Sequence, residues 1–220
     1  MVTKQKSKSQ EHENDPEKPK EKKKFKILAA GDFHGDASIT KKLAERAHRE
    51  KVDLVILTGD ITSPIETKNL LKPFIERGEK VVFVPGNWDT TETINFLSQL
   101  YGIKNVGDHS VRYDNVGIFG IGSPDWQMEL DDKKAYDKLK KDFDKIKDLE
   151  KKIMVSHLPA AGTKSEFSGV PGSPALRRAI DKFQPDIFVS GHIHEGEGLY
   201  EKIGKTRVFN VGRKGTIIEL

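Results

Sequence analysis

The stretch KILAAGDFHG (residues 26–35) joins a short apolar run to a polar turn, and this combination recurs along the chain. Four further apolar runs, at 54–58, 81–84, 152–156 and 186–190, lead into polar residues in the same way. Short apolar runs bounded by glycine and polar residues are typical of buried strands. The sequence therefore predicts five strands, each ending in a polar turn.

Segments with helical periodicity lie between these strands. Ile39, Leu43 and Ala47 recur at the spacing of one helix face. The helices expected on this basis cover residues 39–51, 66–77, 91–100, 132–150 and 173–183. Helices that alternate with continuous apolar strands indicate an α/β fold with a mostly parallel sheet covered on both faces.

Two regions depart from this alternation and predict antiparallel additions. Residues 110–122, SVRYDNVGIFGIG, indicate a hairpin that turns at Asp114-Asn115. Residues 199–220 indicate two or three consecutive strands, with turns at Ile203-Gly204 and at 213–215. The expected sheets are therefore mixed.

Composition limits the class of protein. A chain of 220 residues suits one domain of this kind, and the absence of cysteine excludes disulfides, thiolate metal sites and a cysteine nucleophile. No apolar run approaches the ~18 residues of a membrane span, and the charged N-terminus does not resemble a secretory signal. We expect a cytoplasmic protein that does not associate with membranes.

Residues 1–24 form a Lys- and Glu-rich segment with eight lysines and five acidic residues. Its net charge of +3 accounts for most of the +4 of the whole chain, so residues 25–220 carry only +1. Such a polar segment buries too little apolar surface to offset its ordering entropy. We expect a disordered tail followed by one domain over 25–220, and the tail could serve as an electrostatic arm for nucleic acid or a partner.

Residues of types that commonly bind metals follow every predicted strand. Their side chains are carboxylates, imidazoles and one amide, and most come directly after a glycine: Asp32 and His34, Asp60, Asn87, His157, His192 and His194. Each of them alone would be a turn residue or a buried histidine. Because the carboxyl ends of parallel strands meet at one edge of a sheet, we expect all seven to converge.

This set of side chains indicates a metal centre. Mixed imidazole and carboxylate ligands without sulfur suit manganese, iron, nickel or zinc, whereas calcium prefers oxygen alone. Seven ligands exceed what one ion takes from a protein, so two ions that share one carboxylate fit better. Paired metals that activate a bridging water are a recurring device for phosphoryl displacement.

The series GDFH, GD, GNWD, SHLP and GHIH resembles the five motifs of the calcineurin-like metallophosphoesterases, over residues 25–220. The stretches SPDW (123–126), SHLPAAGTKSEFSG (156–169) and GHIHEGEG (191–198) look most like small predicted phosphoesterases related to bacterial cyclic-AMP phosphodiesterase. The resemblance implies a two-sheet αββα sandwich and two divalent metal ions, with manganese expected first.

The resemblance also implies a role for each ligand. Asp32, His34 and His194 would hold the first metal, and Asn87, His157 and His192 the second. Asp60 would bridge the two ions and a bridging hydroxide would be the nucleophile. Asn87 would also contact the phosphate, so the catalytic set is Asp60, Asn87 and His157.

Two departures from the family pattern bear on mechanism. Trp88 occupies a position where the family often has a histidine that donates a proton to the leaving group. Either the protein lacks this acid, or Trp88 only walls the pocket and another group such as His109 supplies the proton. After Asp60 the chain reads Ile61-Thr62 instead of the Asp-Arg-Gly of protein phosphatases, which argues against that activity.

The expected function is hydrolysis of phosphodiester or phosphomonoester bonds in a small phosphorylated substrate. A metal-poor interaction module on the same fold is an alternative, although all seven ligand positions are filled. A phosphodiesterase that acts on nucleic acid through its basic tail is another. The sequence leaves a homo-oligomer open and does not name the substrate.

Overall fold

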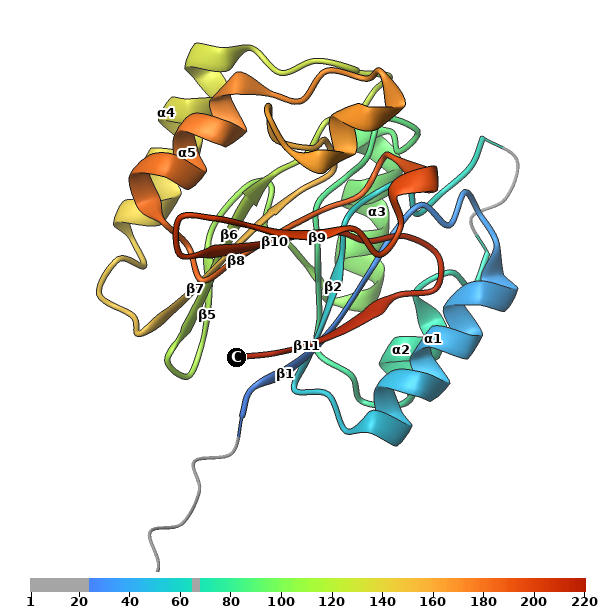
Figure 1. The fold of residues 1–220 in the computed structure, drawn as a ribbon. Coiled ribbons are helices and arrows are strands. Elements are labelled where there is room, and N and C mark those ends of the chain that lie inside the picture. Colours follow the sequence, from blue (N-terminus) through green and yellow to red (C-terminus); the bar gives the residue numbers. More distant parts are fainter. Residues whose placement is uncertain (1–23, 65–67) are drawn as a thin grey trace, which may run out of the picture.

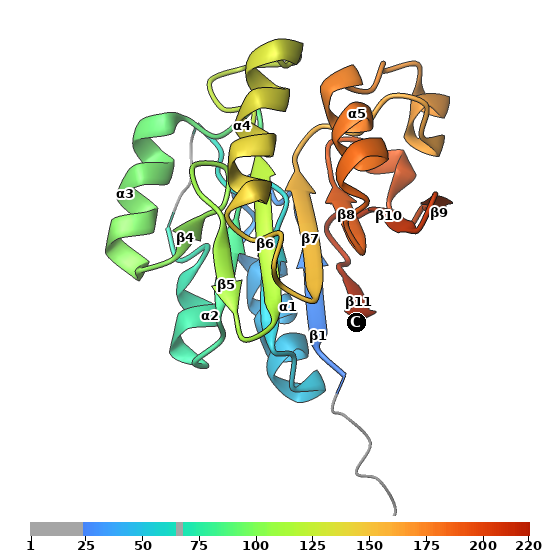
Figure 2. The ribbon, with the colours of Figure 1, turned by 90° about the vertical axis from the view of Figure 1, so that its left-hand side faces the viewer.

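The computed structural model describes residues 24–64 and 68–220, which form two sheets packed face to face with helices on both outer sides (Figures 1 and 2). The prediction for residues 1–24 therefore lies outside the described part of the chain, apart from Lys24. The predicted α/β fold with two mixed sheets is confirmed.

The first sheet has five strands in the order β11-β1-β2-β3-β4. Strands β1 to β4 are parallel, whereas the C-terminal strand β11 pairs antiparallel with β1. The bounds are β1 (Lys26–Ala30), β2 (Leu54–Leu57), β3 (Val81–Phe83), β4 (Lys104–Asn105) and β11 (Thr216–Glu219).

The second sheet has six strands in the order β5-β6-β7-β8-β10-β9. Its central strands are parallel, and antiparallel hairpins form both edges. The bounds are β5 (Val111–Tyr113), β6 (Val116–Ile121), β7 (Lys151–Ser156), β8 (Ile187–Ser190), β9 (Tyr200–Ile203) and β10 (Thr206–Asn210). The predicted hairpin turn at Asp114-Asn115 is confirmed.

The helices cover the outer faces of the sheets. On the first sheet lie α1 (Ala37–Glu50), α2 (Lys72–Glu76) and α3 (Thr91–Tyr101), and on the second α4 (Asp132–Asp144) and α5 (Pro174–Phe183). Short 3-10 helices η1 (Lys164–Ser168) and η2 (His194–Gly196) lie in loops. In the described part of the chain, no helix combines the length and apolar character that crossing a membrane requires.

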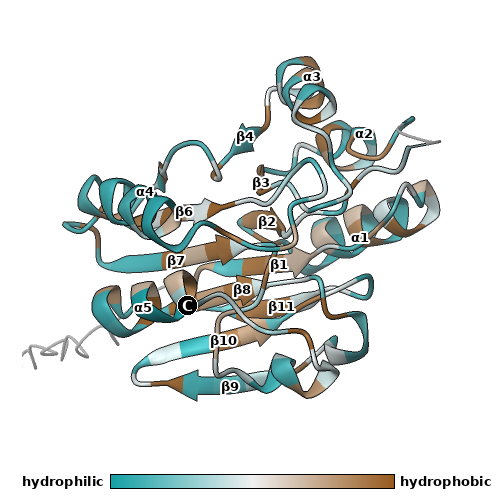
Figure 3. Ribbon diagram, turned by 90° about the horizontal axis from the view of Figure 1, so that it is seen from above, coloured by the Kyte–Doolittle hydropathy of each residue, from teal (hydrophilic) through white to brown (hydrophobic). Residues whose placement is uncertain are grey.

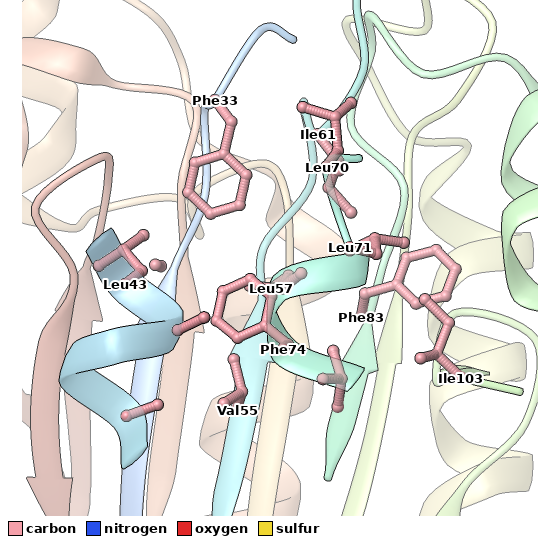
Figure 4. Packing of buried hydrophobic residues seen from close by; sticks show 14 of the residues in the cluster. Phe33, Leu43, Val55, Leu57, Ile61, Leu70, Leu71, Phe74, Phe83 and Ile103 are labelled. Atoms are coloured by element: carbon pink, nitrogen blue, oxygen red, sulfur yellow. The ribbon is translucent and has the colours of Figure 1, made fainter. Parts of the chain in front are cut away.

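Three apolar layers explain why the strands are apolar without alternation. In β1, Ile27 and Ala29 face the second sheet, and Leu28 and Ala30 face the helices of the first. Figure 4 shows Phe33 and Leu43 packed on this outer face with residues of β2 and α2. A third layer lies beneath α4 and α5, whose hydrophilic residues face outward (Figure 3). Both faces of each central strand are thus buried.

Two predicted helices are shorter in the structure. Of the helix expected over 66–77, residues 66 and 67 lie outside the described part, and among residues 68–77 only α2 is helical. Pro73 lacks an N–H and therefore fits only the first turn of a helix. The helix expected over 132–150 ends at Asp144, and tight turns follow in which Ile146 donates its N–H to the Phe143 carbonyl. The two-residue strand β4 was not predicted.

Candidate metal centre

The turns after β1 and β2 are hydrogen-bonded to each other beyond the end of the sheet. Asp32 donates its amide N–H to the Gly59 carbonyl, and His34 donates to the Asp60 carbonyl, both at 2.9 Å. Asp32, His34 and Asp60 all have left-handed backbones, with φ of 57°, 47° and 48°. This backbone conformation is uncommon for residues other than glycine.

The glycine before Asn87 is required by close approach of the neighbouring loop. A Cβ atom at Gly86 would lie 2.2 Å from Oδ1 of Asp60, which is inside van der Waals contact. Gly59 combines a φ of +99° with a position where a Cβ atom would meet Gly86 at 2.4 Å. Glycines therefore allow the ends of β2 and β3 to bring their polar side chains together.

One group of donor atoms joins the turns after β1 and β8. His34 Nε2 lies 3.3 Å from His194 Nε2, and His194 Nε2 lies 3.8 Å from Oδ1 of Asp32. The Asp60 carboxylate approaches this group, because its Oδ2 lies 3.7 Å from His34 Nε2. Donor atoms of Asp32, His34 and His194 are close enough together to hold one ion.

A second group surrounds the fully buried imidazole of His157. Its Nδ1 donates to the Thr58 carbonyl at 2.8 Å, which leaves Nε2 as the free lone pair of the neutral ring. Around Nε2 lie Asn87 Oδ1 at 2.8 Å, His192 Nδ1 at 3.2 Å and Asp60 Oδ2 at 3.5 Å. The structure thus brings all seven predicted residues together, and Asp60 Oδ2 faces a histidine of each group.

Burial shifts the pKa of both aspartates and of three of the histidines toward their neutral forms. Burial and the nearby charge of Asp60 raise the pKa of Asp32 well above its usual range, and burial likewise raises the pKa of Asp60. Burial lowers the pKa of His157 and His192 to about 4 and also lowers that of His34. At neutral pH these imidazoles are uncharged, so their nitrogens are available as ligands.

A divalent cation fits this arrangement of donors. Oδ2 of Asp32 is buried without a hydrogen-bond partner, and the neutral His157 ring directs a lone pair at the Asn87 amide oxygen. Two buried carboxylates and several lone pairs facing one another are costly unless a positive charge lies between them. Imidazole with carboxylate and amide oxygen is a donor set for manganese, iron, nickel or zinc.

Asp89 supports the centre and was not among the predicted site residues. Its buried carboxylate accepts from the amides of Ile61, Thr62 and Gly86, at 3.2, 2.8 and 2.9 Å, and from the Thr62 hydroxyl. These bonds tie the loop after β2 to the loop after β3. Asp89 thereby positions Asp60 and Asn87, and the last letter of GNWD was its only signal in the sequence.

A cleft of about 320 Å³ opens over the donor atoms. Five of the seven predicted residues line it, while Asp32 and His157 are buried. Its wall is formed by Trp88, Trp126 and Met128, which are 39%, 58% and 54% exposed. Trp126 and Met128 were not predicted as site residues. His109 is exposed and is not among the described residues that line this cleft.

Comparison with known proteins gave one family and several related structures. The model of a family described as calcineurin-like phosphoesterase matches residues 25–196. A search of curated proteins found no match. Among solved structures, TT1561 of Thermus thermophilus superposes with a TM-score of 0.70 at 19% identity, over 90% of this chain and 99% of that one.

Two further structures share the fold at similarly low sequence identity. An archaeal protein described as a novel phosphodiesterase has a TM-score of 0.50 and 18% identity, covering 89% of this chain and 99% of its own. A protein of Danio rerio described as a dimetal phosphatase has a TM-score of 0.58 and 14% identity, covering 86% and 88%. At such low identity these likenesses concern the fold.

Proposed function

This chain belongs to the calcineurin-like phosphoesterase family, and we propose from this premise that it is a dinuclear metal-dependent phosphoesterase acting on a small phosphorylated substrate. One observation carries the proposal. Seven side chains from five strand ends direct lone pairs and carboxylate oxygens into one place, although burial opposes the charge of both aspartates. A cluster with only a structural role would not require Oδ2 of Asp32 to be buried without a hydrogen-bond partner.

We assign the ligands in two sets with one shared member. Asp32, His34 and His194 hold the first ion, in agreement with the proximity of their donor atoms. Asn87, His157 and His192 hold the second. Asp60 is assigned as the bridge because its Oδ2 lies within 4 Å of His34 in one set and of His157 in the other.

Asp32 also lies close to Asp60 and His157, so proximity alone would allow it to be shared. Its Oδ1, however, accepts the His192 amide at 3.2 Å and lies 3.8 Å from His194. These contacts hold Asp32 toward the turn after β8 and favour Asp60 as the bridge.

The protein's own groups orient and support the reaction. When bound, two divalent ions would lower the pKa of a water molecule and neutralise charge on the phosphate. Thr58 fixes the tautomer of His157 through its carbonyl oxygen, so that Nε2 remains a ligand. The oxygen of Asn87 faces His157, which leaves its amide nitrogen to donate to a phosphate oxygen in the cleft.

Phosphodiesters are the substrate class that we favour, with phosphomonoesters second. The motifs after β6, β7 and β8 resemble small phosphoesterases related to cyclic-AMP phosphodiesterase, and one structure that shares the fold is described as a phosphodiesterase. The complete ligand set supports an enzyme over a metal-poor interaction module. Manganese is the first choice of metal, ahead of iron, nickel and zinc.

Metal content and turnover test the proposal together. Purified full-length protein is assayed for bound metals, stripped with chelator and reloaded with manganese. It is then screened with phosphodiesters, phosphomonoesters and cyclic nucleotides. We expect about two ions per chain and hydrolysis that chelator abolishes and manganese restores. A metal-free protein with no hydrolysis after manganese loading would instead support an interaction module.

A further inference from the structure

The two tryptophans of the cleft stand beside the metal centre with much of their surface exposed. Their rings lie 4.8 Å apart at an interplanar angle of 57°, so together they form an aromatic corner. The Trp88 ring also contacts the His34 ring edge-on at 5.4 Å. Large aromatic side chains are costly to expose, so two of them at the mouth of one cleft indicate a surface for a ligand.

The backbone around Trp126 holds the side chain in this exposed position. Asp125 and Trp126 have left-handed conformations, with φ of 60° and 63°. Such a conformation is an outlier for a bulky residue and costs on the order of 1 kcal/mol or more. Burial does not repay this cost, because Trp126 is more than half exposed.

Specific hydrogen bonds maintain the strained segment. Trp126 donates its amide N–H to the Asn87 carbonyl at 2.8 Å, and Asp125 donates to the Asp89 carbonyl at 3.0 Å. The Asp125 carboxylate accepts from the amide and the hydroxyl of Thr91 at 3.0 and 2.6 Å. The aromatic corner is therefore attached directly to Asn87, a proposed metal ligand, and has a fixed position relative to the metal centre.

The charged residues around the cleft limit the kind of substrate that it can bind. None of the described residues that line it is lysine or arginine. Beyond the phosphate at the metal centre, further phosphate groups would find no cationic partner among these lining residues, and the nearby Arg213 pairs with Asp36 at 2.9 Å. A substrate with one phosphate and an uncharged, apolar ester group matches both the metal centre and the aromatic wall.

We propose that the Trp88–Trp126 corner is a stacking subsite that selects phosphodiesters whose ester group carries a planar aromatic ring, such as a phenyl group or a nucleobase. This inference rests on the proposed phosphoesterase function and adds a substrate class to it. The angle between the indoles lets a ring stack on one of them while its edge meets the other.

Intrinsic fluorescence offers a test that does not depend on turnover, because Trp88 and Trp126 are the only tryptophans of the chain. Full-length protein is titrated with methyl phenyl phosphate, with the methyl ester of adenosine monophosphate, and with dimethyl phosphate, which has the same charge. Each titration is made with manganese and again with chelator. We expect both aromatic diesters to change the fluorescence in both states, and dimethyl phosphate to have no effect with chelator.

Variants of Trp126 identify the source of the selectivity. Trp126→Leu should weaken binding and raise KM for the aromatic diesters by about 5- to 150-fold, the range expected for the loss of a stacking partner. Dimethyl phosphate should be unaffected, and Trp126→Phe should retain most of the affinity. Phe96→Leu, an equally exposed aromatic residue outside the cleft, is the matched control and should change nothing.

The outcomes separate this inference from the proposed function. Equal losses for aromatic and methyl diesters in Trp126→Leu, or no loss at all, would overturn the stacking subsite even if hydrolysis is observed. Ring-dependent binding without hydrolysis would remove the phosphoesterase function but keep the subsite. A response to only one of the two aromatic diesters would support the subsite and identify the ring that the corner accepts.

Discussion

Trp88 donates its backbone N–H to Oδ1 of Asp60 at 2.9 Å, and this bond fixes the carboxylate between the two groups of ligands. Oδ1 is thereby committed to the loop after β3, whereas Oδ2 lies 3.7 Å from His34 Nε2 and 3.5 Å from His157 Nε2. The two oxygens of Asp60 thus have different roles: Oδ1 holds the side chain in position, and Oδ2 faces the histidines of both proposed ligand groups.

Replacing Asp60 by asparagine separates the role of Oδ1 from that of Oδ2. The amide oxygen of Asp60→Asn can still accept from Trp88, but an NH₂ group then faces His34 and His157 in place of an acceptor. We expect bound metal to fall by at least about half, and turnover to fall by more than the roughly 10–100-fold typical of losing an outer-shell partner. Metal analysis and steady-state kinetics measure both effects.

Circular dichroism should show that this variant remains folded. Asp144→Asn is a suitable control, because Asp144 pairs with Lys140 on the exposed side of α4. That variant should keep its metal and its activity. Full metal occupancy and turnover in Asp60→Asn would contradict the assignment of Asp60 as the shared ligand.

The buried imidazole of His157 should make the stability of the metal-free protein depend on pH. Burial lowers its pKa to about 4, whereas in the unfolded chain it returns to about 6.5. Between these values the unfolded chain binds a proton that the folded chain does not. The contribution of His157 to the free energy of unfolding is therefore complete above pH ~6.5 and falls by on the order of 3 kcal/mol toward pH ~4.

His157→Asn isolates this contribution, because asparagine can still donate to the Thr58 carbonyl and does not titrate. Urea denaturation of the metal-free wild type and variant, from about pH 7 down to pH 4, gives the difference between their free energies of unfolding. We expect the wild type to lose stability relative to the variant as the pH falls. A difference that does not change with pH would show that the ring is already protonated or solvated.

The indole of Trp88 cannot act as a proton donor, so activity should depend strongly on the leaving group. A general acid typically contributes roughly 10²–10⁴-fold, and most for leaving groups that are unstable as anions. A series of substituted phenyl methyl phosphates varies the pKa of the leaving group while every member keeps its ring. We expect the wild-type rate to fall steeply as that pKa rises.

In Trp88→His, kcat for the poorest leaving groups should rise at least about 10-fold, because the imidazole would lie beside His34 in the cleft. KM for these aryl diesters should rise as well, because the variant loses one indole of the corner. His109→Ala should behave like the wild type, because His109 does not line the cleft. A flat dependence in the wild type would mean that a working acid is already present. A flat dependence accompanied by loss of rate in His109→Ala would identify that acid as His109.

Deletion of residues 1–23 should leave the domain intact. The deletion keeps Lys24, whose exposed ion pair with Glu219 at 3.2 Å is worth at most about 1 kcal/mol. We expect the free energy of unfolding to change by less than this and the turnover of small substrates to stay the same. A loss of several kcal/mol would contradict the prediction of a tail that does not contribute to the core.

The same deletion examines nucleic-acid binding. Affinity for DNA and RNA is measured at several salt concentrations with and without residues 1–23. Binding that weakens steeply with salt in the full chain only would favour an electrostatic arm. Equal, weak binding by both chains would leave the small phosphorylated substrate as the better assignment.

The strands of the centre were predictable because each one is largely buried and leads into a polar residue, in most cases behind a glycine. Those two features are local, and they placed the turns after β1, β2 and β3 correctly. The length of α2 was predicted wrongly because the apolar periodicity extends to residues before Pro73, and periodicity gives no sign that proline lacks an N–H. Local signals therefore predicted positions better than extents.

The aromatic wall was not predictable in the same way. Trp126 reaches the cleft because its amide donates to the Asn87 carbonyl and its φ is positive. The neighbouring residues in the sequence indicate neither property. The partner of β11 was equally hidden: turns in 199–220 predicted the strand, but its pairing with β1 depends on residues nearly the whole domain away. Long-range contacts decide both features.

The pairing of β11 with β1 has a consequence for the order of assembly during synthesis. Ile27 lies opposite Ile218, so the strand that carries Asp32 at its end receives its second neighbour only when residues 216–219 have been made. His192 and His194 also arrive late. Closing so long a loop is slow compared with forming local contacts. The β1 strand is made early, but the sheet beneath the candidate metal centre is complete only after β11 has paired with it.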